Sequence, residues 1–126
     1  ILMNTTACLN ESANEKFKTG EMIMMKILSK ILPPQKDNEL ALNYLTNKIG
    51  VSIKNIEWVA VRPDTLIDEN EVSSYTIHSG TTRSPLFNPG KTSRINVADF
   101  MAGLLKNENL WEEWKYKCPV IYNTQS

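Results

Sequence analysis

The strongest run of apolar residues lies in the middle of the chain, at residues 56–68. Residues 59–61 are consecutive apolar residues, which is typical of a strand covered on both faces. Pro63 offers no N–H group to a sheet ladder, so we expect the strand to end there. In open α/β sheets, ligands bind beyond the carboxyl ends of parallel strands. Residues 62–68 are therefore the first place to look for a functional site.

Apolar runs near both ends of the sequence predict two further strands. Residues 1–5 read as a short strand that ends in amide and hydroxyl side chains, and residues 119–122 read as a closing strand. The predicted order is strand, two helices, strand, excursion, helix, strand. This order favours the α/β class, with a parallel sheet flanked by helices.

Three stretches have helical patterns. Residues 22–32 are apolar on more than one face, which predicts a helix that begins at a Thr19 cap, packs between layers and fills the core with its methionines. A second helix is expected over residues 35–50, with the glycine at its end as the stop. A third is expected to begin at an Asn96 cap with Asp99 in its first turn.

Residues 68–89 form a long, turn-rich excursion in which residues 72–78 are expected to form a short extended piece. An excursion of this length in a compact domain usually serves as a lid or binding loop, so we expect it to lie on the substrate side. His78, the only histidine, could act as a general acid or be an idle residue of an exposed loop. Arg83 and Arg94 could bind an anionic substrate or a cofactor phosphate, or form structural salt bridges.

Length and composition indicate one soluble globular domain. Fourteen basic residues balance fourteen acidic ones, which argues against nucleic acid or an anionic membrane as a partner. No apolar run reaches the roughly 20 residues of a membrane helix, and we expect a cytoplasmic protein. Cys8 and Cys118 are far apart and the chain has one histidine, so the sequence predicts two buried thiols and no metal site.

Four sequence pieces, taken together and in order, resemble the atypical short-chain dehydrogenase/reductases of the NmrA-like group. Residues 58–63, Trp-Val-Ala-Val-Arg-Pro, resemble the sixth strand of that family, and residues 2–5 are similar to its strand-end serine motif. Residues 93–100 resemble its Arg-x-x-x-Val-Ala-x-Phe segment, and residues 119–123 its closing strand. The resemblance implies a Rossmann-type fold, NAD or NADP as cofactor, and oxidoreductase activity on a small-molecule carbonyl substrate.

The resemblance also implies roles for residues at the two strand ends. Thr5 is the one catalytic candidate, as a hydroxyl that would orient a carbonyl, although such hydroxyls often only satisfy the backbone. Arg62 could contact the cofactor, or it could form an ion pair with Asp64 or Asp68. The backbone of residues 63–66 would contact the nicotinamide ring. The candidate cofactor-binding residues are Asn4, Thr5, Arg62, Pro63, Asp64 and Leu66.

The resemblance covers only the C-terminal half of the family's domain. The Gly-rich turn that holds the pyrophosphate has no counterpart, because all five glycines are isolated. We therefore expect residues 1–126 to be a partial Rossmann domain, either a fragment or one whose other half lies elsewhere. The strand at residues 1–5 would have an unpaired apolar edge, which favours a homo-oligomer such as a dimer.

The catalytic tyrosine and lysine of the active family are also missing. Their positions correspond to Gln35 and Glu39, which cannot transfer a proton as a tyrosine does or lower its pKa. Tyr44 and Lys48 have the right spacing but come two helical turns too late. The alternatives to an oxidoreductase are a non-catalytic dinucleotide-binding regulator with a protein partner, or a dimerising half-domain.

Overall fold

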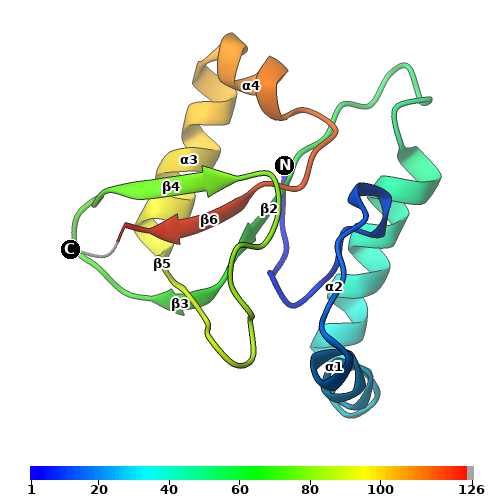
Figure 1. The fold of residues 1–126 in the computed structure, drawn as a ribbon. Helices are drawn as coiled ribbons and strands as arrows, with labels where there is room; N and C mark the ends of the chain where they lie inside the picture. Colours follow the sequence, from blue (N-terminus) through cyan, green and yellow to red (C-terminus); the bar gives the residue numbers. More distant parts are fainter. Residues whose placement is uncertain (125–126) are drawn as a thin grey trace.

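A computed structural model describes residues 1–124 and shows a main sheet of four strands (Figure 1). Their order across the sheet is β1 (Leu2–Met3), β2 (Ala60–Pro63), β6 (Val120–Asn123) and β4 (Tyr75–His78). The first three are parallel to one another, and β4 pairs with β6 in the antiparallel direction. The predicted α/β class with a parallel sheet is confirmed.

The central strand β2 is buried because helices cover both faces of the sheet. Val59 and Val61 are fully buried on the face covered by α3 (Arg94–Lys106), where they join Phe100 in one core cluster. Trp58 and Ala60 point to the opposite face and pack in a second cluster with residues of α2 (Pro33–Asn43) and its extension. This alternation is the two-residue period of a strand. The prediction of a strand covered on both faces is therefore correct.

Helix α1 (Thr19–Ile31) lies at the surface, which contradicts its predicted place between layers (Figure 1). Its side chains Ile27 and Ile31 are 46% and 67% exposed, and Glu21 and Met25 are its only buried residues. Thr19 is the first helical residue and makes no cap, since Lys18 occupies the N-cap position. The helix packs against α2 but leaves one apolar stripe facing outward.

The second helix ends where the sequence predicted, but by a different route. After Asn43 the α-helix continues as a π-helical turn, η2 (Tyr44–Ile49), and Gly50 stops it with a φ of 52°. This left-handed value is one that glycine adopts without strain. The indole of Trp58 donates to the Gly50 carbonyl (2.9 Å), which ties the helix end to the strand.

Helix α3 begins at Arg94, two residues before the predicted cap. Its N-cap is Ser93, whose hydroxyl accepts a bond from the Asn96 N–H (3.3 Å). Asn96 itself is buried in the first turn, so the predicted Asn96 cap is wrong. Asp99 falls beyond the first turn and accepts a hydrogen bond from the Tyr75 hydroxyl (2.7 Å). Helix α4 (Glu108–Trp114) then folds back onto α3.

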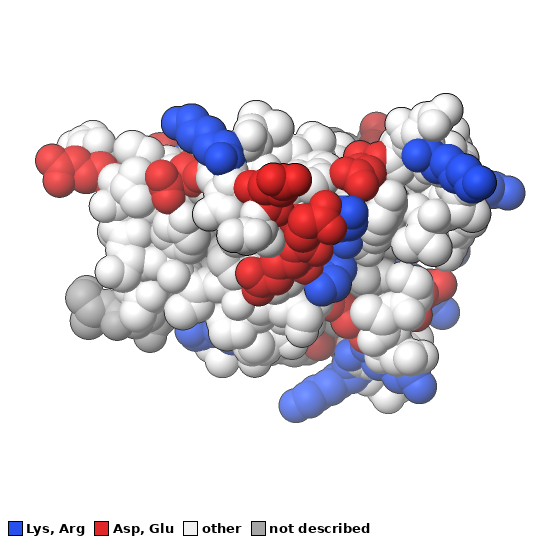
Figure 2. Space-filling model, turned by 90° about the horizontal axis from the view of Figure 1, so that it is seen from above, with Lys and Arg blue, Asp and Glu red and all other residues white. Residues whose placement is uncertain are grey.

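Charges of both signs are interspersed on the face seen in Figure 2. Near α4, for example, Lys115 forms ion pairs with Glu57 and Glu112. This face has no broad basic field of the kind that binds a nucleic-acid backbone. Within residues 1–124, no helix is long and apolar enough to cross a membrane, and no group of three metal-binding side chains is present.

Candidate functional site

The carboxyl ends of β1 and β2 lie side by side. The N–H of Asn4 donates to the carbonyl of Val61 (2.8 Å), and the N–H of Thr6 donates to that of Pro63 (3.1 Å). Two parallel strands in this register end at the same edge of the sheet. The structure therefore brings the candidates Asn4, Thr5 and Pro63 to the same edge of the sheet.

Asn4 and Thr5 have different surroundings at this edge. Asn4 is buried, and its amide donates to the carbonyl of Asn38 in α2 (2.9 Å) while accepting from the Thr5 N–H (2.9 Å). The half-buried Thr5 accepts a bond from the Ala7 N–H (3.2 Å). Within residues 1–124, no group accepts the Thr5 hydroxyl proton. Asn4 thus fixes the strand to the helix, and Thr5 keeps a donor for a ligand.

Arg62 is fully buried and bound on every side by protein. Its two terminal nitrogens form a bidentate ion pair with Glu15 (2.6 and 2.7 Å). Its remaining N–H groups donate to the carbonyls of Cys8 and Cys118 at 2.7–3.0 Å. The predicted ion pair with Asp64 or Asp68 is wrong, because the partner is Glu15. A cofactor contact by Arg62 would require Glu15 to be displaced, since all five guanidinium donors are occupied.

Beyond Pro63 the chain turns into β3 (Thr65–Ile67), which pairs with β5 (Lys91–Ser93) in a separate two-stranded sheet. The Asp64 carboxylate accepts bonds from the N–H groups of Thr65 (2.8 Å) and Gly90 (3.0 Å). Burial nevertheless raises the pKa of Asp64 above its usual value. Leu66 is partly buried and packs against the core cluster under α3. A nicotinamide contact by this segment stays a prediction.

The predicted excursion is partly sheet. β4 lies inside the extended piece expected at residues 72–78. It carries His78, which is therefore on a strand and not on the exposed loop considered for it. Its ring lies 5.8 Å from that of Tyr122, and its Nε2 is 3.0 Å from the Thr76 hydroxyl. No helix forms between β3 and α3, as expected.

Residues 79–90 are the remaining loop of the excursion. Arg83 donates to the backbone and side-chain oxygens of Asn88 inside this loop (3.2 and 2.9 Å). Arg94 forms an exposed ion pair with Asp68 (2.7 Å), which matches its structural alternative. Within residues 1–124, no hydrogen bond or ion pair links His78, Arg83 and Arg94, so a common substrate-binding cluster stays a prediction.

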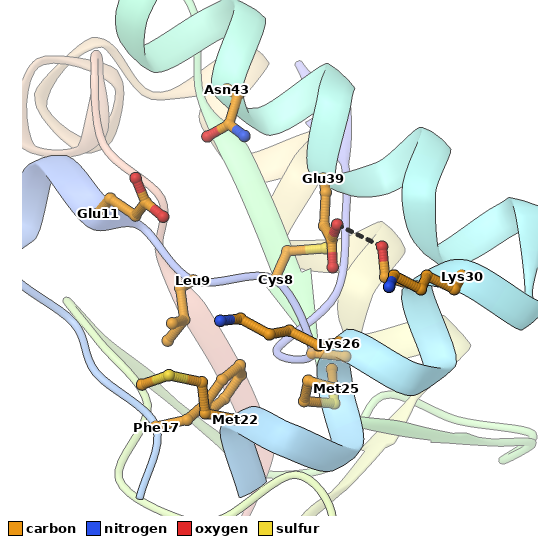
Figure 3. A pocket seen from close by; sticks show the side chains of 12 residues that line it. Cys8, Leu9, Glu11, Phe17, Met22, Met25, Lys26, Lys30, Glu39 and Asn43 are labelled. Atoms are coloured by element: carbon orange, nitrogen blue, oxygen red, sulfur yellow. Dashed lines mark hydrogen bonds between the residues drawn. The ribbon is translucent and has the colours of Figure 1, made fainter. Parts of the chain in front are cut away.

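A cavity of about 560 Å³ opens between α1, α2 and the segment after β1 that includes η1 (Glu11–Ala13) (Figure 3). This volume is in the range of small-molecule sites. Met22 lines the cavity and is 39% exposed, so its interpretation as core filler is wrong. Sequence reasoning missed the site because it placed α1 between layers and because the lining comes from separate segments.

Glu39, which the resemblance matches to a lysine of the active family, faces this cavity (Figure 3). Its two oxygens accept hydrogen bonds from the Ser29 hydroxyl (2.7 Å) and the Gln35 amide (3.2 Å). Gln35 also donates to the Ala7 carbonyl (3.0 Å). The Tyr44 side chain is 59% exposed and does not line the cavity. The structure thus places an oriented carboxylate at the wall of this cavity.

We predict that the two thiols are unreactive in the folded protein. Both are free and buried, and burial raises the pKa of Cys8 to about 12 and that of Cys118 to about 11. At pH 8, a disulfide reagent such as DTNB should label them only after denaturation. These folded pKa values exceed the ordinary value near 9, so the free energy of unfolding should fall as pH rises above about 9. Cys8→Ala should weaken that fall between about pH 9 and 10 in urea titrations, and rapid labelling of the folded protein would contradict the prediction.

Comparisons with known proteins agree with this fold. The sequence model of a family described as NAD(P)H-binding matches residues 1–108. The fold is similar to the crystal structure of the oxidoreductase ylbE from Lactococcus lactis, with a TM-score of 0.59 and 16% identity, over 99% of this chain and 46% of that chain. The chain therefore spans about half the length of that protein, and no curated protein matches its sequence. Because the family match covers most of the sequence, the chain belongs to the NAD(P)H-binding family.

Proposed function

We propose that this chain forms the nicotinamide and substrate side of an NAD(P)-dependent oxidoreductase of the atypical short-chain dehydrogenase/reductase kind, NmrA-like, acting on a small-molecule carbonyl compound. The observation that carries the proposal is the edge where β1 and β2 end together. There the free donor of Thr5 lies two residues before Ala7, which lines the cavity. The family match and the similarity to a protein described as an oxidoreductase support it.

NAD or NADP would accept or supply the hydride in this reaction. The Thr5 hydroxyl, with a proton to donate, fits the nicotinamide end of such a cofactor, and the end of β2 lies beside it, since the Thr6 N–H donates to the Pro63 carbonyl. The turn that binds the cofactor pyrophosphate has no counterpart in residues 1–126, since none of the five glycines belongs to a Gly-rich turn. This chain alone should therefore bind the cofactor weakly.

A second candidate is a non-catalytic dinucleotide-binding regulator that acts on a protein partner. It is favoured by Gln35 and Glu39, because an amide does not titrate and a carboxylate repels an anionic cofactor. Their hydrogen bonds to Ala7 and Ser29 give both residues a structural role. Self-association is part of the same proposal, since β1 has an open edge where Met3 is 51% exposed. Self-association would appear as a dimer in sedimentation, and a strict monomer would contradict the self-association.

The candidates separate on binding and turnover measured with the same sample. Because this chain alone should bind weakly, calorimetry is run at cofactor concentrations high enough to detect weak binding. We expect it to detect NADPH or NADH, and a panel of carbonyl compounds to give turnover. Thr5→Val should lower turnover by roughly 100-fold, as loss of one oxyanion donor does, while Thr5→Ser should retain it. Thr124→Val, which removes an exposed hydroxyl just after β6, is the matched control. Binding without turnover would favour the regulator, and absence of binding would overturn both candidates.

A further inference from the structure

One wall of the cavity between α1 and α2 is apolar. It is formed by Leu9, Phe17, Met22 and Met25, of which Met25 is 5% exposed. Methionine side chains are flexible and polarisable, so such a wall adapts to aliphatic and aromatic groups of different shape. This wall therefore suits a ligand with an apolar body.

Lys26 supplies a positive charge at the same cavity. Its side chain starts on α1 and extends across the cavity toward Leu9 (Figure 3). Among residues 1–124, no carboxylate lies within ion-pair distance of its ammonium group. An ammonium group with three free donors, next to an apolar wall, attracts an acidic group of a ligand.

Glu39 supplies an acceptor of fixed orientation. The hydroxyl of Ser29 and the amide of Gln35 each hold one of its oxygens. A carboxylate has about four lone-pair sites, so about two remain for further donors. Since Glu39 lines the cavity, a ligand group that reaches it must donate a hydrogen bond and carry no negative charge itself.

We propose that this cavity binds small apolar molecules that carry one acidic group for Lys26 and one hydroxyl or amine donor for Glu39. Hydroxy acids and amino acids with apolar side chains have this chemistry. That the bound molecule is also the substrate rests on the proposed function. That the cavity binds this class of molecule does not. Neutral alcohols lack the acidic group, and simple carboxylic acids lack the donor.

Calorimetric titrations with phenyllactate, phenylalanine and phenylpropionate test the ligand class without any cofactor. Phenyllactate carries the hydroxyl, phenylalanine the amine, and phenylpropionate neither. A hydrogen bond to a charged group corresponds to a difference of roughly 10-fold or more in affinity. We expect at least one of the first two to bind tighter than phenylpropionate by that factor, and the tighter one identifies the donor. Equal binding of all three, or no binding, would overturn the proposal.

Two variants assign the contacts. Lys26→Ala should weaken all three acids by roughly 10-fold, whereas Lys36→Ala, an exposed lysine outside the cavity, should leave them unchanged. Glu39→Gln should reduce the preference over phenylpropionate, with the exposed Asp37→Asn as its control. Unchanged binding in Lys26→Ala or unchanged preference in Glu39→Gln, with thermal melting showing intact folds, would overturn it. Binding of these acids without binding of NADPH would contradict the proposed function alone. Binding of NADPH without binding of the acids would contradict only this inference.

Discussion

Replacing Arg62 by alanine should lower the free energy of unfolding by about 3–5 kcal/mol, the range measured when one partner of a buried ion pair is removed. Arg62 has no exposed surface, and the Glu15 side chain is only 10% exposed. The substitution would leave that carboxylate in the interior without its counter-charge. It would also remove the donors that hold the carbonyls of Cys8 and Cys118. Urea unfolding followed by circular dichroism measures the loss.

The matched control is Arg94→Ala. Arg94 forms an ion pair of similar length with Asp68, but the two side chains are 57% and 86% exposed. Water and salt weaken such a pair, so its loss should cost about 0–1 kcal/mol. Arg62→Lys should fall between the two, because lysine keeps the charge and lacks the planar fork. Equal losses for the Arg62 and Arg94 variants would refute the structural role given to Arg62.

The sequence was informative where local chemistry decides the structure. Residues 59–61 could be assigned to a buried strand because a central parallel strand must be apolar on both faces. Pro63 marked its end because it lacks the N–H group, and Gly50 marked the helix stop because few other residues adopt its φ of 52°. Such features depend on one residue type at one position.

The sequence was misleading where partners are distant in the chain. Glu15 lies 47 residues before Arg62, and no spacing rule distinguishes it from the acidic residues Asp64 and Asp68 close by. The apolar pattern of α1 predicted burial, yet the helix packs mainly against α2 and leaves Ile31 exposed. The cavity beside it could not be predicted for the same reason. A cavity is formed by the relative positions of several segments, and the sequence of any one segment does not specify them.

The helix cap shows a smaller failure of the same kind. Ser93 and Asn96 are both good N-cap residues, and each precedes an apolar stretch. In the structure Ser93 is the N-cap. Asn96 is buried in the first turn, where its side chain forms hydrogen bonds with Ser73 and Asn123 of two other segments. The sequence pattern predicted Asn96 as the cap, and the buried polar network places Asn96 inside the helix instead.

Replacing Gly90 by alanine should destabilise the protein by roughly 1–3 kcal/mol or more, as overpacking of a dense interior does. A Cβ atom at Gly90 would lie 2.4 Å from Cδ1 of Tyr122 and 2.7 Å from its Cε1. The ring has little room to yield, because Tyr122 is 6% exposed and lies beside His78. Differential scanning calorimetry should show a clearly lower melting temperature.

Gly20→Ala is the control for the same chemical change. No atom lies within 4 Å of a Cβ at Gly20, in the first turn of α1, so alanine should stabilise that helix by up to about 1 kcal/mol. Adding Tyr122→Leu to Gly90→Ala should recover part of the loss if the ring contact is its cause. A neutral Gly90→Ala would mean that the loop moves freely away from β6. In that case the Gly90 N–H could not hold the Asp64 carboxylate, and the end of β2 would lose the support that shapes the proposed cofactor edge.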